Sequence, residues 1–371
     1  MDLFVYGTLR SAALMAAVSG GQDLQSIPAK LSGYAVFPVK GNVVPFIATQ
    51  PDGVAEGCVF VGLTQQQMDR LNLYEGAFGY TLETVEVQTD TGPRKACCYL
   101  PPDDLGSGEG AWSLADWEAG HLAPAILAMT ELFALDPLPS PATLRTMWPM
   151  IEARAWAKHR AQVAPATTRF DAGPDDFQIK DARPPHGHFF RFQSLDVVHR
   201  TFNGAVPPVL TREGFIGIDA AIVLPYDPVQ DRVLLVEQAR LGPRLRHDPN
   251  PWMLEPVAGI VDARETPEAA ALRECKEEAG LTIRALEQAG SFYVSPGSSS
   301  DYFYTYVGLC TLPETDSYLG GLQSEAEDLR LHPMSLDKAM ALADSGEIAT
   351  GPALYLLYWI FRHKDRLRTM V

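Results

Sequence analysis

The sequence predicts an α+β protein with two domains. A chain of 371 residues exceeds the usual size of a single hydrophobic core. Short β-type runs punctuated by Gly and Pro come first, helical patterns follow, and strand patterns return from Phe177 onward. We therefore expect a first domain over residues 1–112, a helical extension over 113–162, a linker over 163–175 and a second domain over 176–371.

The first domain shows strand patterns, whereas the extension shows helical patterns interrupted by proline. The β-type runs of the first domain are Leu3–Tyr6, Gly57–Leu63, Thr84–Gln88 and Lys95–Leu100. In the extension, Pro124 and Pro149 are expected to break the helices, because proline removes a backbone donor and clashes with the preceding turn.

The second domain follows a segment, VAPATTRFDAGPD, that is poor in apolar periodicity and therefore favours a linker. Its expected strands are Phe189–His199, Ala220–Leu224, Val233–Glu237 and Phe292–Val294. An amphipathic helix is expected at Ala353–Arg366, near the end of the chain.

Composition limits the function. The chain is 46% hydrophobic and 20% charged, as in a globular protein with real cores. A net charge of −16 argues against sequence-independent binding to nucleic acid, although bridging metals would still permit nucleotide ligands. The sequence shows no signal peptide and no run of 18 apolar residues, so we expect a cytoplasmic protein that does not enter membranes. Five cysteines without metal spacing predict reduced thiols.

The segment Gly259–Leu281, GIVDARETPEAAALRECKEEAGL, is the most informative part of the chain. Thr266 can cap the start of a helix, and Pro267 suits its first position. Gly280 suits the left-handed residue after the helix end. The segment therefore predicts a loop followed by a helix that ends at Gly280.

Three glutamates, Glu274, Glu277 and Glu278, share one face of this expected helix, because they stand at i, i+3 and i+4. Their carboxylates repel one another, so the face needs either a cation or full solvation. Mg²⁺ prefers oxygen ligands and retains water and phosphate oxygens. Arg273 stands four residues before Glu277 and can orient it. The pattern favours a metal platform for a diphosphate, and the alternative is a solvated acidic face.

The same segment fits the pattern G-x5-E-x7-R-E-U-x-E-E-x-G-U, where U is a bulky apolar residue, and resembles the Nudix box. One position departs, because Cys275 replaces the usual aliphatic residue. Pro296, sixteen residues after Gly280, and the segments around it are similar to the ADP-ribose pyrophosphatase subgroup, including its tellurite-resistance-associated type. This resemblance implies a Nudix α/β/α sandwich with a mixed sheet.

The Nudix resemblance implies hydrolysis of ADP-ribose to AMP and ribose 5-phosphate with Mg²⁺, for which Mn²⁺ is a possible substitute. The implied metal ligands are Glu274, Glu278, Glu327 and the backbone carbonyl of Ala258. Glu325 matches the base that activates water, and Glu277 supports the site.

The resemblance also implies substrate contacts. Arg240 matches an arginine that contacts the diphosphate; the alternative is an ion pair with a surface acid. Arg212 and Phe189 match a pair that sandwiches adenine, with the phenylalanine supplied by the second subunit of a homodimer. Asp301 stands near the expected terminal ribose, where Glu is usual, so another substrate such as GDP-mannose stays open. A non-catalytic ADP-ribose sensor is the other alternative, although a sensor would be expected to lose the box carboxylates.

The N-terminal strings LFVYGTLR (Leu3–Arg10) and LYEGAFGY (Leu73–Tyr80) resemble the gamma-glutamylcyclotransferase-like fold, a small β-barrel with helices. The resemblance implies that the backbone of four consecutive residues forms an anion cradle: Tyr6, Gly7, Thr8 and Leu9. It implies that Glu75, which we expect in a Gly-flanked turn, takes a proton from the substrate amine. The substrate stays open among γ-glutamyl amino acids, amines and peptides, and loss of activity is the alternative.

Overall fold

The computed structural model describes residues 1–371 except 103–104, 107, 109, 162–165, 323–324, 326 and 371. The chain forms two compact units. The first unit comprises Met1–Phe189 with Asp196–Val209, and the second comprises Phe190–Leu195 with Leu210–Val371.

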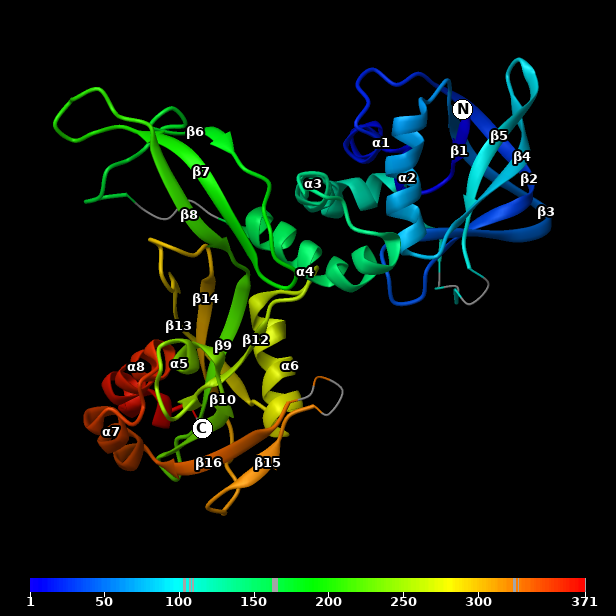
Figure 1. Cartoon of the computed structure of the whole chain (residues 1–371). Coiled ribbons are helices and arrows are strands. Elements are labelled where there is room, and N and C mark those ends of the chain that lie inside the picture. The colour runs from blue at the N-terminus through cyan, green and yellow to red at the C-terminus, as the bar shows by residue number, and fades with distance from the viewer. Residues whose placement is uncertain are drawn as a thin grey trace. The chain divides into compact units, whose positions relative to one another are not determined.

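The first unit contains a closed five-stranded barrel with the order β1-β3-β2-β4-β5 (Figure 1). Its strands are β1 (Leu3–Val5), β2 (Ser26–Pro38), β3 (Pro45–Phe60), β4 (Thr81–Thr89) and β5 (Gly92–Leu100). The short β1 closes the barrel, because it pairs antiparallel with β3 and parallel with β5. Successive residues of β1 point to opposite faces. Phe4 therefore belongs to one core cluster, and Leu3 and Val5 to the other.

Helices cover the barrel and share the cluster that contains Leu3 and Val5. They are η1 (Thr8–Arg10), α1 (Ala12–Ser19), α2 (Gln65–Ala77), α3 (Leu114–Leu132) and α4 (Pro141–Arg160). A capping box of Thr64 and Gln67 begins α2. The expectation that Pro124 and Pro149 break helices is wrong, since they lie inside α3 and α4. Burial of Pro124 and of neighbouring apolar residues shows that packing outweighs the local penalty here.

The strands β6 (Phe177–Ala182), β7 (Arg191–His199) and β8 (Leu210–Ile216) form a separate three-stranded sheet in the order β6-β7-β8. The strand expected at Phe189–His199 thus begins two residues later. The five cysteines are free thiols, and Cys98, Cys275 and Cys310 are buried.

The second unit is built on a mixed sheet with the order β13-β14-β9-β10-β16-β15, to which β11 and β12 add at β10 and β9. The strands are β9 (Asp219–Asp227), β10 (Arg232–Ala239), β11 (Trp252–Glu255), β12 (Val257–Ile260), β13 (Ala285–Tyr293), β14 (Tyr302–Leu309), β15 (Tyr318–Gly320) and β16 (Leu329–Ser335). The pair β9 and β14 is parallel, whereas β13 and β14 are antiparallel.

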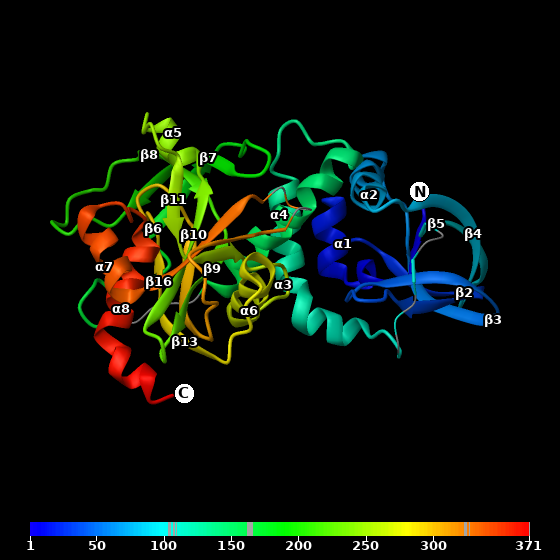
Figure 2. The ribbon, with the colours of Figure 1, turned by 90° about the horizontal axis from the view of Figure 1, so that it is seen from below.

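Helices pack on both faces of this sheet. They are α6 (Pro267–Ala279), α7 (Leu336–Ser345) and α8 (Gly351–Arg368), whereas the short helix α5 (Leu241–Leu245) has no buried residue. Leu234 and Val236 of β10 join the core under α6, whereas Val233 and Leu235 join the core under α7 and α8. Figure 2 shows α6 and the α7–α8 pair on opposite sides of the strands. This confirms the predicted α+β fold, with an N-terminal barrel and a C-terminal mixed sheet between helices.

Candidate functional sites

The helix α6 begins and ends where its sequence predicts. The Thr266 side chain accepts a hydrogen bond from the Ala269 N–H at 3.2 Å, and Pro267 is the first helical residue. Gly280 adopts the left-handed conformation (φ 66°) after the last turn. The carboxylate-bearing face of α6 is therefore fixed by caps at both ends.

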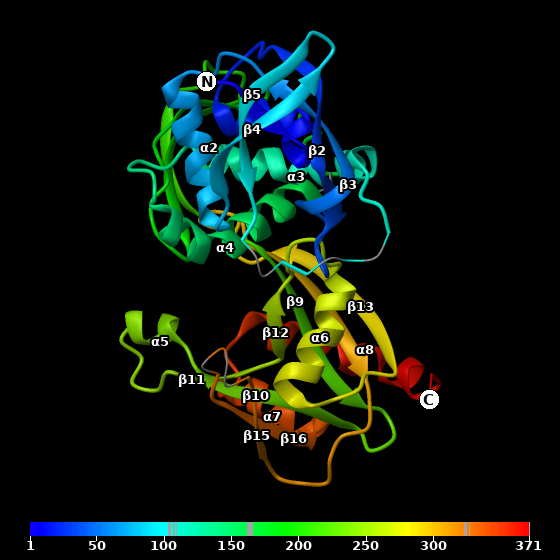
Figure 3. The same cartoon turned by 90° about the vertical axis from the view of Figure 1, so that its right-hand side faces the viewer.

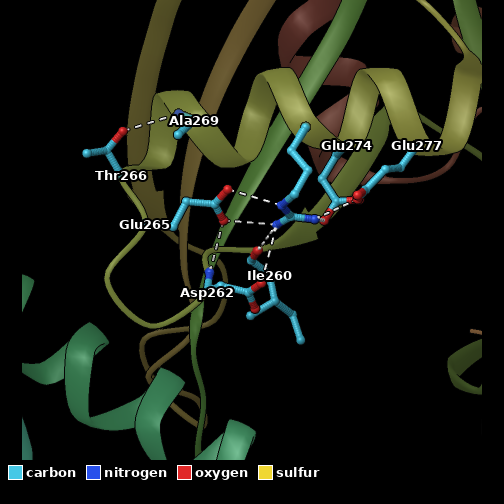
Figure 4. A network of polar contacts seen from close by, with 8 residues as sticks. Ile260, Asp262, Glu265, Thr266, Ala269, Glu274 and Glu277 are labelled. Atoms are coloured by element: carbon cyan, nitrogen blue, oxygen red, sulfur yellow. Dashed lines mark hydrogen bonds and ion pairs between the residues drawn. The ribbon is translucent and has the colours of Figure 1, made fainter. Parts of the chain in front are cut away.

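Arg273 connects α6 to the loop that precedes it (Figure 4). Its Nε and Nη2 donate to the two oxygens of Glu265 at 3.0 Å each, and Nη2 also donates to the Ile260 carbonyl at 3.0 Å. Its Nη1 donates to Glu274 and, at 2.9 Å, to Glu277. These hydrogen bonds hold the pKa of Arg273 above its usual value, with those from Glu265 the largest cause. One guanidinium thus fixes the loop and two carboxylates together.

Gly259 lies directly against the Glu274 carboxylate. A Cβ atom at residue 259 would fall 1.8 Å from Oε1 and 2.0 Å from Cδ of Glu274. No larger residue fits there without moving the loop or the carboxylate. The glycine of the box is therefore required by close approach rather than by an unusual backbone conformation.

Glu278 is the most deeply buried carboxylate of this site. The residue is 3% exposed, and its Oε2 atom has no hydrogen-bond partner among the described residues. Burial, together with the charges of Glu274 and Glu327, raises the pKa of Glu278 to about 8 against the opposing effect of the Arg240 charge. A buried oxygen without a partner beside two more carboxylates is an arrangement that a cation would stabilise.

The end of β15 and the residue after it contact the C-terminal end of α6. The Gly321 N–H donates to the Glu278 carbonyl at 2.9 Å, and a Cβ at Gly320 would fall 2.1 Å from the same oxygen. Glu327 accepts from the Leu322 N–H at 3.1 Å and lies close enough to raise the pKa of Glu274 and of Glu278. The structure therefore brings Glu327 to the box helix, although it lies 49 residues beyond Glu278 along the chain.

Among the described residues, no three His, Cys, Asp or Glu side chains converge closely enough to hold a metal ion by themselves. The oxygen donors of Glu274, Glu278 and Glu327 fit Mg²⁺ in type. Ala258 lies beside them on β12, and its backbone forms a hydrogen bond with Glu278. An ion held here would need further oxygens from the backbone, from water or from a substrate.

The expected base and diphosphate contact lie in different surroundings. Glu325 is exposed, and only its backbone N–H bonds within the described chain, to the Leu322 carbonyl at 3.0 Å. Arg240 donates through Nε to Glu255 at 2.6 Å, and its charge lowers the pKa of Glu278. Arg240 therefore both forms an ion pair and faces the acidic cluster.

The residues expected to contact adenine and the terminal ribose are Arg212, Phe189 and Asp301. Both carboxylate oxygens of Asp301 accept hydrogen bonds, from the Ile218 N–H at 3.2 Å and from the Ser299 hydroxyl. Arg212 is exposed on β8 and donates to the Thr211 carbonyl. Phe189 is 47% exposed. The substrate contacts of these three residues stay predictions.

In the first unit, Glu75 lies in the last turn of α2, so the expectation of a turn is wrong. Burial raises the pKa of Glu75 to about 8. Burial raises the pKa of the tyrosines and the cysteine around it, and the Glu75 charge adds to this effect: Tyr6, Tyr74, Tyr80, Tyr99 and Cys98. Cys98 and Tyr99 could not be found from the sequence, because residues on β5 are brought to α2 only by closure of the barrel.

The expected anion cradle lies between β1 and η1. The Gly7 and Thr8 carbonyls accept from the Arg10 and Ser11 N–H groups at 3.0 Å each. In the described part of the chain, no hydrogen bond uses the N–H groups of Gly7, Thr8 or Leu9. The Tyr6 hydroxyl donates to the Tyr99 carbonyl at 3.1 Å and so links the start of this turn to β5. Three free backbone donors in succession can bind an anion.

Comparisons with known proteins match each half of the chain to a family. Residues 218–350 match the NUDIX domain, and residues 3–119 match the family described as gamma-glutamyl cyclotransferase, AIG2-like. The chain therefore belongs to the Nudix family and carries an AIG2-like domain of the gamma-glutamyl cyclotransferase type ahead of its Nudix domain. Both resemblances inferred from the sequence are confirmed.

Individual relatives fall into two groups. An ADP-ribose pyrophosphatase of Escherichia coli (strain K12) is 35% identical over 196 residues, which cover 53% of this chain and 93% of the relative. A GDP-mannose pyrophosphatase of Enterobacter sp. (strain 638) is 27% identical over 149 residues, or 40% of this chain and 76% of the relative. Protein AIG2 B of Arabidopsis thaliana is 31% identical over 134 residues, or 35% and 78%. In the described residues, no helix is long and apolar enough to span a membrane.

Proposed function

We propose that the second unit is a Mg²⁺-dependent hydrolase that splits the diphosphate of ADP-ribose into AMP and ribose 5-phosphate. The observation that carries this proposal is the buried, unpartnered oxygen of Glu278 beside Glu274 and Glu327. The name of the Escherichia coli relative supports ADP-ribose as the substrate. Mn²⁺ is proposed as a substitute ion.

In this proposal, the ion is held by Glu274, Glu278, Glu327 and the backbone carbonyl of Ala258. When bound, it supplies positive charge against the diphosphate and lowers the pKa of a water ligand. Arg273 holds the carboxylates of Glu274 and Glu277 in place before substrate arrives, which is the condition for electrostatic preorganisation.

The remaining residues of the proposed site act on the attacking water or contact the substrate. Glu325, whose exposed carboxylate can reach solvent, takes the proton as water attacks phosphorus. Arg240 contacts the diphosphate, Arg212 and Phe189 hold adenine, and Asp301 lies near the terminal ribose. We also propose a cytoplasmic homodimer that assembles through the Nudix domain and supplies the Phe189 of the partner subunit.

GDP-mannose is the second candidate substrate, because a relative carries that name. Hydrolysis of ADP-ribose, GDP-mannose, NADH and diadenosine polyphosphates should be compared with Mg²⁺ and with EDTA. We expect Mg²⁺-dependent release of AMP, fastest from ADP-ribose. Faster turnover of GDP-mannose would make GDP-mannose the preferred substrate. Binding of ADP-ribose without turnover of any compound would instead favour a non-catalytic ADP-ribose sensor.

For the first unit, we propose a γ-glutamyl cyclotransferase in which Glu75 takes a proton from the substrate α-amine. The free amine then attacks the γ-amide carbonyl. As the amide bond breaks, Glu75 passes the proton to the leaving nitrogen, and 5-oxoproline and an amine leave. Two observations support this proposal: Glu75 has a raised pKa and lies near Tyr6, and the three residues that follow Tyr6 in the chain have free backbone N–H groups. Release of 5-oxoproline from γ-glutamyl amino acids, amines and peptides tests this proposal, and no release from any of them would contradict it.

A further inference from the structure

The helix α4 lies outside the matched cyclotransferase region, which ends at residue 119, yet it packs with the helices of that region. Leu144, Met147 and Ile151 of α4 are buried in one cluster with Leu71 and Ala77 of α2. Figures 1 and 3 both show α4 beside α2. The helix is therefore part of the core on which the Glu75 helix rests.

The contacts of α4 concentrate on the residues that flank Glu75. The Trp148 ring lies 5.7 Å from that of Tyr74 and 5.3 Å from that of Phe78, measured between centroids. At Gly76, a Cβ would meet the Pro141 ring at 3.7 Å, which is ordinary van der Waals contact. Side chains of α4 thus hold positions on both sides of Glu75.

Arg145 of α4 binds the end of α2 itself. The last carbonyls of a helix lack partners within the helix, and a cation near them is favourable. The Glu75 and Gly76 carbonyls accept from the N–H groups of Phe78 and Gly79. The Ala77 carbonyl accepts from Arg145 Nε at 2.6 Å, while α2 has no basic residue in its own last turn. The turn after α2 therefore provides no donor for the Ala77 carbonyl, and Arg145 of α4 supplies the hydrogen bond.

We propose that α4 completes the N-terminal site and that Arg145 is a positioning residue, which fixes the end of α2 so that Glu75 stays buried among tyrosines. The functional meaning of this inference rests on the cyclotransferase role proposed for Glu75. The positioning role of Arg145 does not depend on the cyclotransferase activity, since it concerns only where the Glu75 carboxyl lies.

The test uses the full chain, labelled with ¹³C at the glutamate carboxyl carbons, with the Glu75 signal assigned by its loss in Glu75→Gln. The signal is titrated in the wild type, Arg145→Met, Arg145→Lys and Lys158→Met. Lys158 is the matched control, because it removes one positive charge from the same helix at a contact with Glu131 rather than with α2. Amide exchange of Phe78, Gly79 and Tyr80 is measured on the same samples.

If Arg145 positions the helix end, Arg145→Met should let water reach Glu75, lower its titration midpoint toward that of an ordinary carboxyl, and speed the three amides by about threefold to tenfold. Arg145→Lys should lie between that variant and the wild type, and Lys158→Met should match the wild type. An unchanged or raised midpoint in Arg145→Met would overturn the proposal, because loss of charge alone disfavours the ionised carboxyl. A shifted midpoint in a protein that releases no 5-oxoproline would keep the positioning role and reject the cyclotransferase.

Discussion

The two candidate sites both contain a buried glutamate whose pKa is raised to about 8, but the surroundings differ. Glu278 lies beside two further carboxylates and within reach of the Arg240 charge. Glu75 lies among tyrosines, and burial alone accounts for its raised pKa. The first arrangement suits a multivalent cation, whereas the second suits a single proton. The same residue type thus serves different chemistry according to its neighbours.

The largest expected effect is that of Glu278→Gln. Loss of one carboxylate charge should lower kcat for ADP-ribose by roughly 10²- to 10⁴-fold, because metal and substrate charge are no longer held. The melting temperature should change little, since the oxygen that changes has no partner. Steady-state kinetics across a Mg²⁺ series measures this effect.

Glu268→Gln is the matched control, because it neutralises an acid of the same helix whose bond to the Tyr306 hydroxyl an amide can keep. Its turnover should stay within about twofold of the wild type, as for a surface change. Near-wild-type turnover of Glu278→Gln at saturating Mg²⁺ would remove Glu278 from the metal site.

Gly259→Ala should have the next largest effect. Its methyl group would fall on the Glu274 carboxylate and push it away from Arg273 or from the ion, so we expect a loss of roughly tenfold to a hundredfold in kcat. The Mg²⁺ concentration for half-maximal activity should rise as well. Gly280→Ala is the contrast: it strains a left-handed residue, and should lower stability by about 1 kcal/mol without changing the Mg²⁺ dependence. Equal Mg²⁺ profiles for both variants would reject the close-approach argument.

Glu75→Gln separates the two sites. We expect it to abolish 5-oxoproline release and to leave ADP-ribose hydrolysis within about twofold, because the two carboxylates lie in different compact units. Parallel assays of both reactions on one preparation provide the measurement. A large loss of diphosphatase activity would mean that the two reactions are coupled.

The smallest expected effect is on stability. Folding raises the pKa of Glu75 from 4.5 to about 8, so the folded chain binds this proton more tightly than the unfolded chain. The stabilisation is complete below pH 4.5 and is lost as pH rises through 8. Between pH 5 and pH 8 the wild type should therefore lose on the order of 2 kcal/mol relative to Glu75→Gln, after allowing for partial exposure. Urea unfolding measures this loss, and identical pH slopes for the two proteins would contradict the buried carboxyl.

Local signals explain why some elements could be predicted from the sequence. The start and end of α6 depend on Thr266, Pro267 and Gly280, which act on their own neighbours. The helix around Glu75 was missed for the opposite reason. Gly76 and Gly79, which follow LYE, favour a turn, while the capping box at Thr64 and the burial of Leu71 sustain the helix through Gly76.

The environment of each carboxylate could not be predicted, because it depends on distant segments. Glu278 is buried partly by the close approach of Gly320, and Glu327 arrives by the same loop. Arg145 lies 70 residues beyond Glu75, and no pattern in the sequence connects them. The residue types of each site could be predicted from the sequence, whereas the pKa values of these residues depend on the three-dimensional structure.

The packing of α3 and α4 against the barrel also decides where the chain can be cut. A recombinant fragment that stops at residue 119, where the family match ends, would expose the apolar surface that Leu144, Met147 and Ile151 now cover. Such a fragment should aggregate, whereas one that continues past Arg160 keeps the helix pair whole. Any transplantation of this domain onto another enzyme would have to carry both helices with it.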